Sequence, residues 1–173
     1  MELTRSEQTV LRCLAVYSGE ALYESQIAKN SKVSTGATNQ SLKKLLKRNM
    51  VLLEKKGNMN FYSLNIDNPL VRQFKISQTI ALLNSLIHRL KSLAKIIILF
   101  GSCAEGADTQ DSDIDIVVVS QSEQEARKIV KKEKITREIQ ALIFTTSDFM
   151  RLAENDKPLY ERIQKGIVLW RRD

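Results

Sequence analysis

The spacing of apolar positions changes along the chain, and each change marks a different kind of element. In the first 50 residues the apolar positions recur at helical spacing and predict three helices. The helices cover residues 3–15, 25–30 and 34–48, with Thr4 or Ser6 and then Ser34 as candidate N-caps. Two short strands follow at residues 51–54 and 61–64, with residues 55–58 as the turn between them.

The middle of the chain has a different pattern. After Asn68 and Pro69, residues 70–94 contain neither Gly nor Pro, and their apolar positions alternate steps of four and three from Ile76 to Ala94. This spacing predicts one helix with a heptad-like stripe, starting near Pro69. The stripe can pair two copies of the chain as a homodimer or dock onto the chain's own C-terminal domain, and the additional apolar residues Leu82 and Leu86 favour docking among several elements.

Strand-like and helical patterns alternate in the last 80 residues. Residues 96–100 and 116–119 are apolar runs typical of buried strands, and residues 122–134 are a charged helix. A third strand lies within residues 135–145, a helix covers residues 147–165 up to Gly166, and a last strand follows at residues 167–170. This order predicts a sheet covered by helices.

The chemistry is concentrated between the first two of these strands. Gly101 and Ser102 follow the first strand, and Asp113 and Asp115 come ten residues later, at the start of the second. Side chains two positions apart in a strand lie on one face, so the two carboxylates are expected side by side. Mg²⁺ takes one or two carboxylates together with substrate phosphates. The pattern therefore predicts a site for a nucleoside triphosphate (NTP) and its metal.

These residues resemble the GS-x10-DxD signature of the DNA polymerase beta-like nucleotidyltransferases, particularly the small minimal type. The resemblance extends from Lys95 to the C-terminus and implies a mixed sheet flanked by helices. It further implies two Mg²⁺ ions, an NTP substrate and release of pyrophosphate when the nucleotidyl group is transferred. In the resemblance Asp113 and Asp115 are the metal ligands. The matching nucleotide-binding positions are Gly101, Ser102, Gly106 and Ser112.

The match is incomplete at the third acidic position of the family. The residue of the later strand that aligns best is Gln140, whose amide has no negative charge and cannot act as a general base. Glu138 has the same parity and replaces it only in a different strand register. The basic side chains that the family commonly has after the GS pair are absent, since Cys103 and Glu105 stand there.

The N-terminal helices and hairpin resemble the winged helix-turn-helix domain of small bacterial and archaeal transcriptional regulators. Residues 1–75 carry 12 Lys and Arg against 6 Asp and Glu, whereas the rest of the chain has 15 against 14, so the basic surplus lies in this half. The resemblance implies binding of double-stranded DNA, although such domains also dock proteins. The candidate base contacts are Thr35, Thr38, Asn39 and Gln40, and the candidate phosphate contacts are Lys43, Lys44, Lys47, Lys55 and Lys56.

Together these patterns predict an α+β protein with a winged helix-turn-helix at residues 1–67, a linker helix at 68–94 and a nucleotidyltransferase-like domain at 95–173. No stretch is long and apolar enough to span a membrane, and the two cysteines have no metal-ligand spacing, so a cytoplasmic protein is expected. Two functions remain open. One is a nucleotidyltransferase that modifies a partner protein, such as a toxin, or a nucleic-acid end; the other is a DNA-binding regulator or antitoxin-like binding protein whose catalytic site is weakened.

Overall fold

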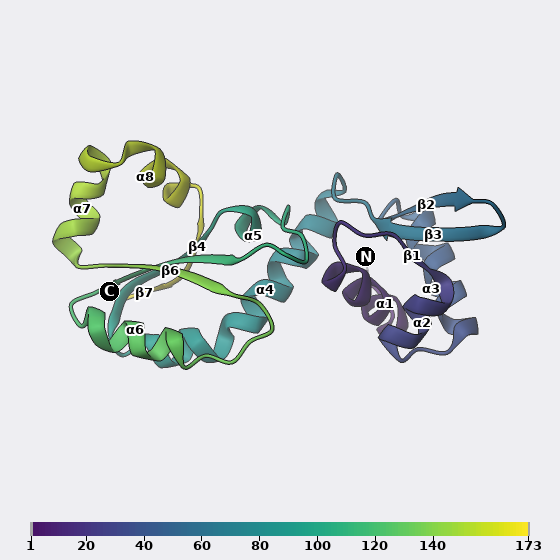
Figure 1. Cartoon of the computed structure of the whole chain (residues 1–173), viewed down its shortest axis with the longest axis horizontal. Helices are drawn as coiled ribbons and strands as arrows, with labels where there is room; N and C mark the ends of the chain where they lie inside the picture. Colours follow the sequence, from purple (N-terminus) through teal and green to yellow (C-terminus); the bar gives the residue numbers. More distant parts are fainter. Residues whose placement is uncertain (1, 173) are drawn as a thin grey trace. The chain divides into compact units, whose positions relative to one another are not determined.

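The computed structural model describes residues 2–172 and divides them into two compact units, one up to Gln73 and one from Phe74 onwards. Figure 1 shows the elements of each unit. Among the described residues no helix has the length and apolar character needed to cross a membrane.

The first unit is a winged helix-turn-helix. Its elements are three helices followed by a hairpin, with a short strand between the first two helices: α1 (Arg5–Val16), β1 (Leu22–Tyr23), α2 (Glu24–Ser31), α3 (Thr35–Lys47), β2 (Val51–Lys56) and β3 (Met59–Leu64). The three strands form an antiparallel sheet in the order β1-β3-β2. The three helices are confirmed, and Thr4 and Ser34 are the N-caps of α1 and α3.

The hairpin is longer than the sequence predicts. Lys55 and Lys56 belong to β2, Lys56 pairs with Met59, and the turn consists of Gly57 and Asn58 alone. Gly57 has φ +60°, a backbone conformation that glycine adopts without the steric cost of a side chain. Strand β1 was not predicted from the sequence, because two residues are too short to carry a periodic pattern.

The second unit is a mixed four-stranded sheet in the order β6-β5-β4-β7. Strands β4 and β5 pair antiparallel, β5 and β6 parallel, and β4 and β7 antiparallel. Its elements are α4 (Pro69–Leu90, which begins in the first unit), β4 (Ala94–Phe100), α5 (Ser102–Glu105), β5 (Ile114–Ser120), α6 (Glu123–Lys131), β6 (Ile139–Phe144), α7 (Thr146–Asn155), α8 (Lys157–Gln164) and β7 (Ile167–Arg171).

Helices cover both faces of this sheet. Helices α4 and α6 lie on one face and α7 and α8 on the other, as Figure 1 shows. Leu83, Leu86 and Leu90 of α4 are fully buried against the sheet. The apolar stripe of the middle helix is therefore used for packing within the chain. Ala94, predicted as the end of that stripe, is instead the first residue of β4, because the helix stops at Leu90.

The single helix predicted for residues 147–165 is wrong, since two helices stand there. The break falls at Asp156, whose side chain accepts a hydrogen bond from the Leu159 amide and caps α8. Pro158 follows in the first turn of α8, where its missing N–H costs nothing, whereas it would interrupt a continuous helix.

Gly166 connects α8 to β7 at a point where the chain passes very close to β4. A Cβ atom at this position would lie 2.5 Å from the Leu99 carbonyl oxygen and 2.8 Å from Ile98 Cγ2. We expect Gly166→Ala to destabilise the second unit by about 1–3 kcal/mol, the usual cost of overpacking. Denaturant unfolding followed by the fluorescence of Trp170, the chain's single tryptophan, measures this unit directly.

Gly36→Ala is the matched control. A Cβ atom at Gly36 would have nothing within 4 Å, and the residue lies in α3 of the first unit. Alanine is the better helix former by up to about 1 kcal/mol, so this variant should not lower the Trp170 transition. Equal Trp170 transitions for Gly166→Ala and the unchanged protein would contradict the tight packing described here.

Candidate functional site

The candidate site begins with a row of three side chains across the sheet. The strand registers pair Phe100 of β4 with Asp115 of β5, and Asp115 with Gln140 of β6. Val117 and Val119, which have the parity of Asp115, lie in the core beneath α7 and α8. Because alternate residues of a strand share a face, Asp115 lies on this α7–α8 face too.

Asp113 joins the row from the segment just before β5. The Gln140 side-chain amide donates a hydrogen bond to Asp113 Oδ2 at 2.7 Å. The Ile114 amide donates to the Glu138 carbonyl oxygen at 2.9 Å, which fastens the start of β5 to the segment preceding β6. The structure thus brings Asp113, Asp115 and Gln140 together. Glu138 is exposed and stands two residues before the position that pairs with Asp115, and its catalytic role stays a prediction.

Gly101 makes the turn that brings the chain past these carboxylates. It has φ +69°, and a Cβ atom there would lie 2.5 Å from Asp115 Oδ2. The backbone conformation therefore makes any larger residue strained, and its side chain would displace the Asp115 carboxylate. Ser102 starts the short helix α5, and Gly106 ends it in the left-handed conformation with φ +66°.

Asp115 is the carboxyl group whose titration the surroundings change. Partial burial raises the pKa of Asp115 above its ordinary value, the Arg162 guanidinium opposes this rise, and the charge of Asp113 adds to it. Two neighbouring carboxylates that repel one another are a favourable place for a cation. Its positive charge would offset both the cost of burying the Asp115 charge and the repulsion by Asp113.

The residues present fit Mg²⁺, which binds through one or two carboxylates and completes its shell with water and phosphate oxygens. Asp113 and Asp115 supply the two carboxylates. Among residues 2–172 no cluster of three or more His, Cys, Asp or Glu side chains is suited to holding a metal. The Gln140 amide lies beside Asp113.

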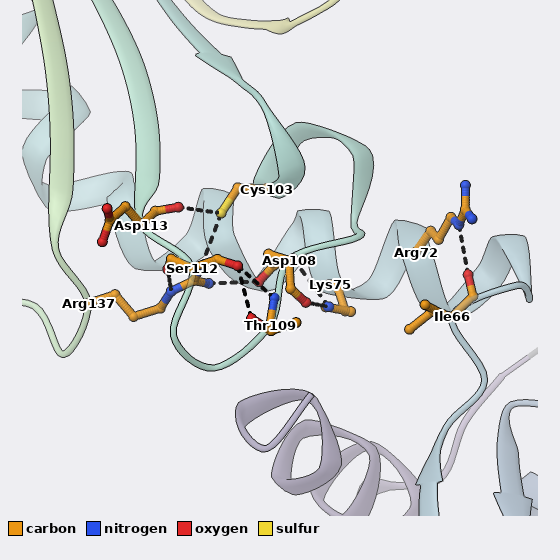
Figure 2. Close-up of polar contacts among 9 residues, drawn as sticks. All are labelled: Ile66, Arg72, Lys75, Cys103, Asp108, Thr109, Ser112, Asp113 and Arg137. Atoms are coloured by element: carbon orange, nitrogen blue, oxygen red, sulfur yellow. Dashed lines mark hydrogen bonds and ion pairs between the residues drawn. The ribbon is translucent and has the colours of Figure 1, made fainter. Parts of the chain in front are cut away.

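The loop between α5 and β5 is fixed by charged residues that sequence reasoning missed. Figure 2 shows Asp108 between Lys75 of α4 and Arg137, which precedes β6. The Asp108 carboxylate pairs with Lys75 Nζ at 3.3 Å and with Arg137 Nη1 at 2.8 Å. Lys75 and Asp108 are both buried. No local sequence signal identifies this network, since Asp108 is 33 residues from Lys75 and 29 residues from Arg137 in the sequence.

Arg137 fastens the same loop at two further points. Its Nε donates to the Ser112 carbonyl oxygen at 2.9 Å, and its Nη2 lies 3.2 Å from Cys103 Sγ. The Ser112 hydroxyl is 2.9 Å from the Thr109 amide, so Ser112 orders the loop from inside. Cys103 is fully buried, and burial raises the pKa of its thiol. These contacts place Asp113 at the end of a rigid loop.

The predicted DNA contacts differ in how accessible they are. Thr35, Gln40, Lys43, Lys47 and Lys55 are exposed. Thr38, however, is fully buried, and its hydroxyl donates to the Val33 carbonyl oxygen at 3.5 Å. A buried side chain cannot reach a base, so the interpretation of Thr38 as a base contact is withdrawn.

Three other predicted contacts are exposed or half-buried but engaged within the protein. The Asn39 amide donates to Glu24 at 2.9 Å. Lys44 pairs with Glu7 at 3.3 Å, and Glu7 is itself buried and also bound by Arg48. Lys56 pairs with Glu54 at 3.2 Å and lies over the Phe61 ring.

Comparison with known proteins identifies the family of the C-terminal half of the chain. The family model described as "Polymerase beta, Nucleotidyltransferase" matches residues 84–173, which is more than half of the chain. The second unit is thus a nucleotidyltransferase-type domain. The chain belongs to the polymerase beta nucleotidyltransferase family. No curated protein matches the sequence significantly.

Two solved structures are similar over parts of the chain. The adhesin competence repressor from Streptococcus pyogenes has 20% identity and a TM-score of 0.39 over 53% of this chain and 70% of its own. TrmBL2, an archaeal chromatin protein with a novel mode of DNA binding, has 14% identity and a TM-score of 0.36 over 95% of this chain and 72% of its own. Likenesses this weak support no conclusion about function.

The raised pKa of Asp115 has a consequence for stability. A carboxyl group whose pKa is raised by folding destabilises the fold above that pKa, and the effect disappears when the pH falls below the unfolded value. We therefore expect Asp115→Asn to raise the unfolding midpoint at pH 7 in EDTA. The advantage should vanish as the pH falls below about 4, the ordinary range of aspartate.

Asp111→Asn is the control for this measurement. Asp111 is an exposed residue of the same loop, and such surface substitutions usually change stability by no more than about 0.5 kcal/mol. A midpoint for Asp115→Asn below that of the unchanged protein at pH 7 would contradict the unfavourable burial of the Asp115 carboxylate and its repulsion by Asp113.

Proposed function

We propose that the second unit is a metal-dependent nucleotidyltransferase, which moves a nucleoside monophosphate from an NTP to a hydroxyl group of a protein or nucleic acid. One observation carries this proposal. Asp115 lies against the Gly101 turn, and Asp113 is hydrogen-bonded to Gln140, the residue that pairs with Asp115 in the sheet.

In this proposal Asp113 and Asp115 hold Mg²⁺, and two ions are expected. When bound, Mg²⁺ supplies positive charge that neutralises the phosphates and the leaving pyrophosphate. The turn at Gly101, with Ser102 and Gly106 at either end of α5, lies beside the phosphates, while Ser112 keeps the loop that carries Asp113 in place.

The acceptor hydroxyl oxygen forms a bond to the α-phosphorus as the bond to pyrophosphate breaks, and the hydroxyl proton is released. Gln140 occupies the position from which a carboxylate would assist that proton. Its amide instead donates to Asp113, which holds the Asp113 carboxylate in a fixed orientation. Glu138, which directly precedes β6, is the proposed alternative acceptor of the proton.

The first unit supports a second part of the proposal, which is that it binds double-stranded DNA and targets or regulates the second. Lys43 and Lys47 lie exposed on α3, and Lys55 lies exposed on the hairpin. Thr35 and Gln40 are exposed towards the N-terminal half of the same helix and are the proposed base contacts. The basic surplus of residues 1–75 fits an anionic partner.

Transfer is tested by incubating the protein with each α-labelled NTP, Mg²⁺ and a cell extract as the source of acceptors. We expect label to appear in a macromolecule, and Asp113→Asn should lower the rate by about a hundred-fold or more, because losing metal-held charge costs several kcal/mol. Gln140→Glu, which restores a third carboxylate, should raise the rate at limiting Mg²⁺. The label also identifies the nucleotide.

The opposite outcome has a clear meaning. If no NTP yields Asp113-dependent label and Gln140→Glu does not restore transfer, the enzyme proposal fails. A DNA-binding regulator or antitoxin-like protein with a weakened nucleotidyltransferase site then becomes the better function, and the observation that favours it is the amide at position 140.

DNA binding is tested by the salt dependence of affinity for a mixture of random duplexes. Each phosphate contact contributes about 0.9 to the slope of log affinity against log salt concentration. Replacing Lys43 and Lys47 by Ala should reduce that slope by roughly 2. Lys44→Ala is the matched control, and its effect should be smaller because Lys44 is paired with Glu7. Binding that does not depend on salt would indicate a protein-docking domain instead.

A further inference from the structure

The candidate site lacks positive charge on the segment beside which the NTP phosphates are proposed to lie. An NTP brings several negative charges to a place where Asp113 and Asp115 already stand, and α5 adds the exposed Glu105. Between Ser102 and Gly106 the chain offers Cys103, Ala104 and Glu105, none of which is a cation. A cation that contacts the phosphates must therefore come from another element.

Two of the cations near the loop are already used. Arg137 binds Asp108, the Ser112 carbonyl oxygen and Cys103, so its guanidinium is committed to the loop. Lys75 pairs with Asp108 and is buried. Both side chains hold the loop in shape and are turned into the protein.

Arg162 of α8 differs from them. Its side chain is exposed, and its Cζ atom lies 5.8 Å from the centroid of the Phe100 ring. Phe100 is the residue before Gly101 and pairs with Asp115 in the sheet. Arg162 thus stands over the α7–α8 face at the end of β4, where the Gly101 turn begins.

The backbone of Arg162 is held firmly. The next residue, Ile163, is fully buried, and Leu159 and Tyr160 pack into the core beneath α8. After α8, Gly166 passes against Leu99. The Phe100 ring limits where the guanidinium can go, and stacking on an aromatic ring leaves the edge of a guanidinium free to donate hydrogen bonds.

We propose that Arg162 binds the phosphate groups of the NTP at this site, so that α8 supplies the cation that α5 lacks. This inference rests on the proposed function, because it assigns a residue to the same site. The guanidinium edge offers two parallel N–H donors, which match two phosphate oxygens. Arg162 binds substrate in this proposal and moves no proton.

The experiment measures binding by calorimetry with three probes in the presence of Mg²⁺: each of the four NTPs, inorganic tripolyphosphate and the matching nucleosides. We expect Arg162→Ala to weaken binding of NTP and tripolyphosphate by about ten- to hundred-fold, the effect of losing charge-assisted hydrogen bonds. Nucleoside binding should not change. Arg162→Lys should recover part of the affinity, because it keeps the charge but not the paired donors.

Arg151→Ala is the matched control, since Arg151 is an exposed arginine on the neighbouring helix α7. It should bind every probe as the unchanged protein does. Trp170 fluorescence and the unfolding midpoint show whether each variant keeps the fold. A merely structural role of Arg162 would weaken nucleoside and phosphate probes alike and would overturn the proposal.

The two proposals fail in different ways. If the unchanged protein binds NTP and Arg162→Ala binds it equally well, Arg162 has no phosphate role, and the nucleotidyltransferase proposal is unaffected. If tripolyphosphate binding depends on Arg162 but no label is transferred from any NTP, the phosphate site stands and the enzyme proposal falls. If neither NTP nor tripolyphosphate binds to the unchanged protein, both are wrong.

Discussion

The register of three neighbouring strands is the constraint on which the candidate site depends. Hydrogen bonds between β4 and β5 align Phe100 with Asp115, and those between β5 and β6 align Asp115 with Gln140. A shift of one residue in β5 would turn both aspartates towards α4 and α6 and expose apolar residues in their place. The large buried side chains on either face prevent such a shift. The packing of the core therefore fixes which side chains lie together at the candidate site.

Burial and charge act together at the loop that precedes β5. Removing charges from water is costly unless each is paired, and here one carboxylate forms ion pairs with two cations from distant parts of the chain. That arrangement specifies a single position for the loop. It contrasts with the Asp113 and Asp115 pair, where partial burial and a neighbouring like charge both disfavour the ionised Asp115. The rigid loop supports the unfavourable pair.

Much of this fold can be predicted from the sequence because the signals are local. Helical spacing with capping residues located the first three helices, and apolar runs located β4, β5 and β6. The GS and DxD spacing predicted that the Gly101 turn and the two aspartates belong to one site, and the structure places Gly101 against Asp115. Errors arose where local rules compete: Pro158 and Asp156 divide a helix that its apolar pattern makes look continuous, and two-residue β1 has no pattern at all.

Other features cannot be predicted from local sequence patterns. Thr38 has a polar side chain in the polar N-terminal half of α3, and only the packing of that helix decides that it is buried. Asp108 and Arg137 are unremarkable charged residues until the sheet brings their segments together. Arg162 lies 60 residues beyond the GS motif, and it reaches Phe100 only because α8 folds back over the sheet. Such contacts depend on tertiary topology.

Helix α4 determines where a fragment containing the second unit should begin. Leu83, Leu86 and Leu90 complete the apolar core beneath the sheet, and Lys75 forms an ion pair with Asp108. A fragment that starts at Lys95 would leave that face of the sheet uncovered and prone to aggregation. A fragment that starts at Pro69 keeps the whole helix. A fragment that is meant to contain the nucleotidyltransferase-type domain with its core should therefore start at the beginning of α4, well before the GS and DxD motifs.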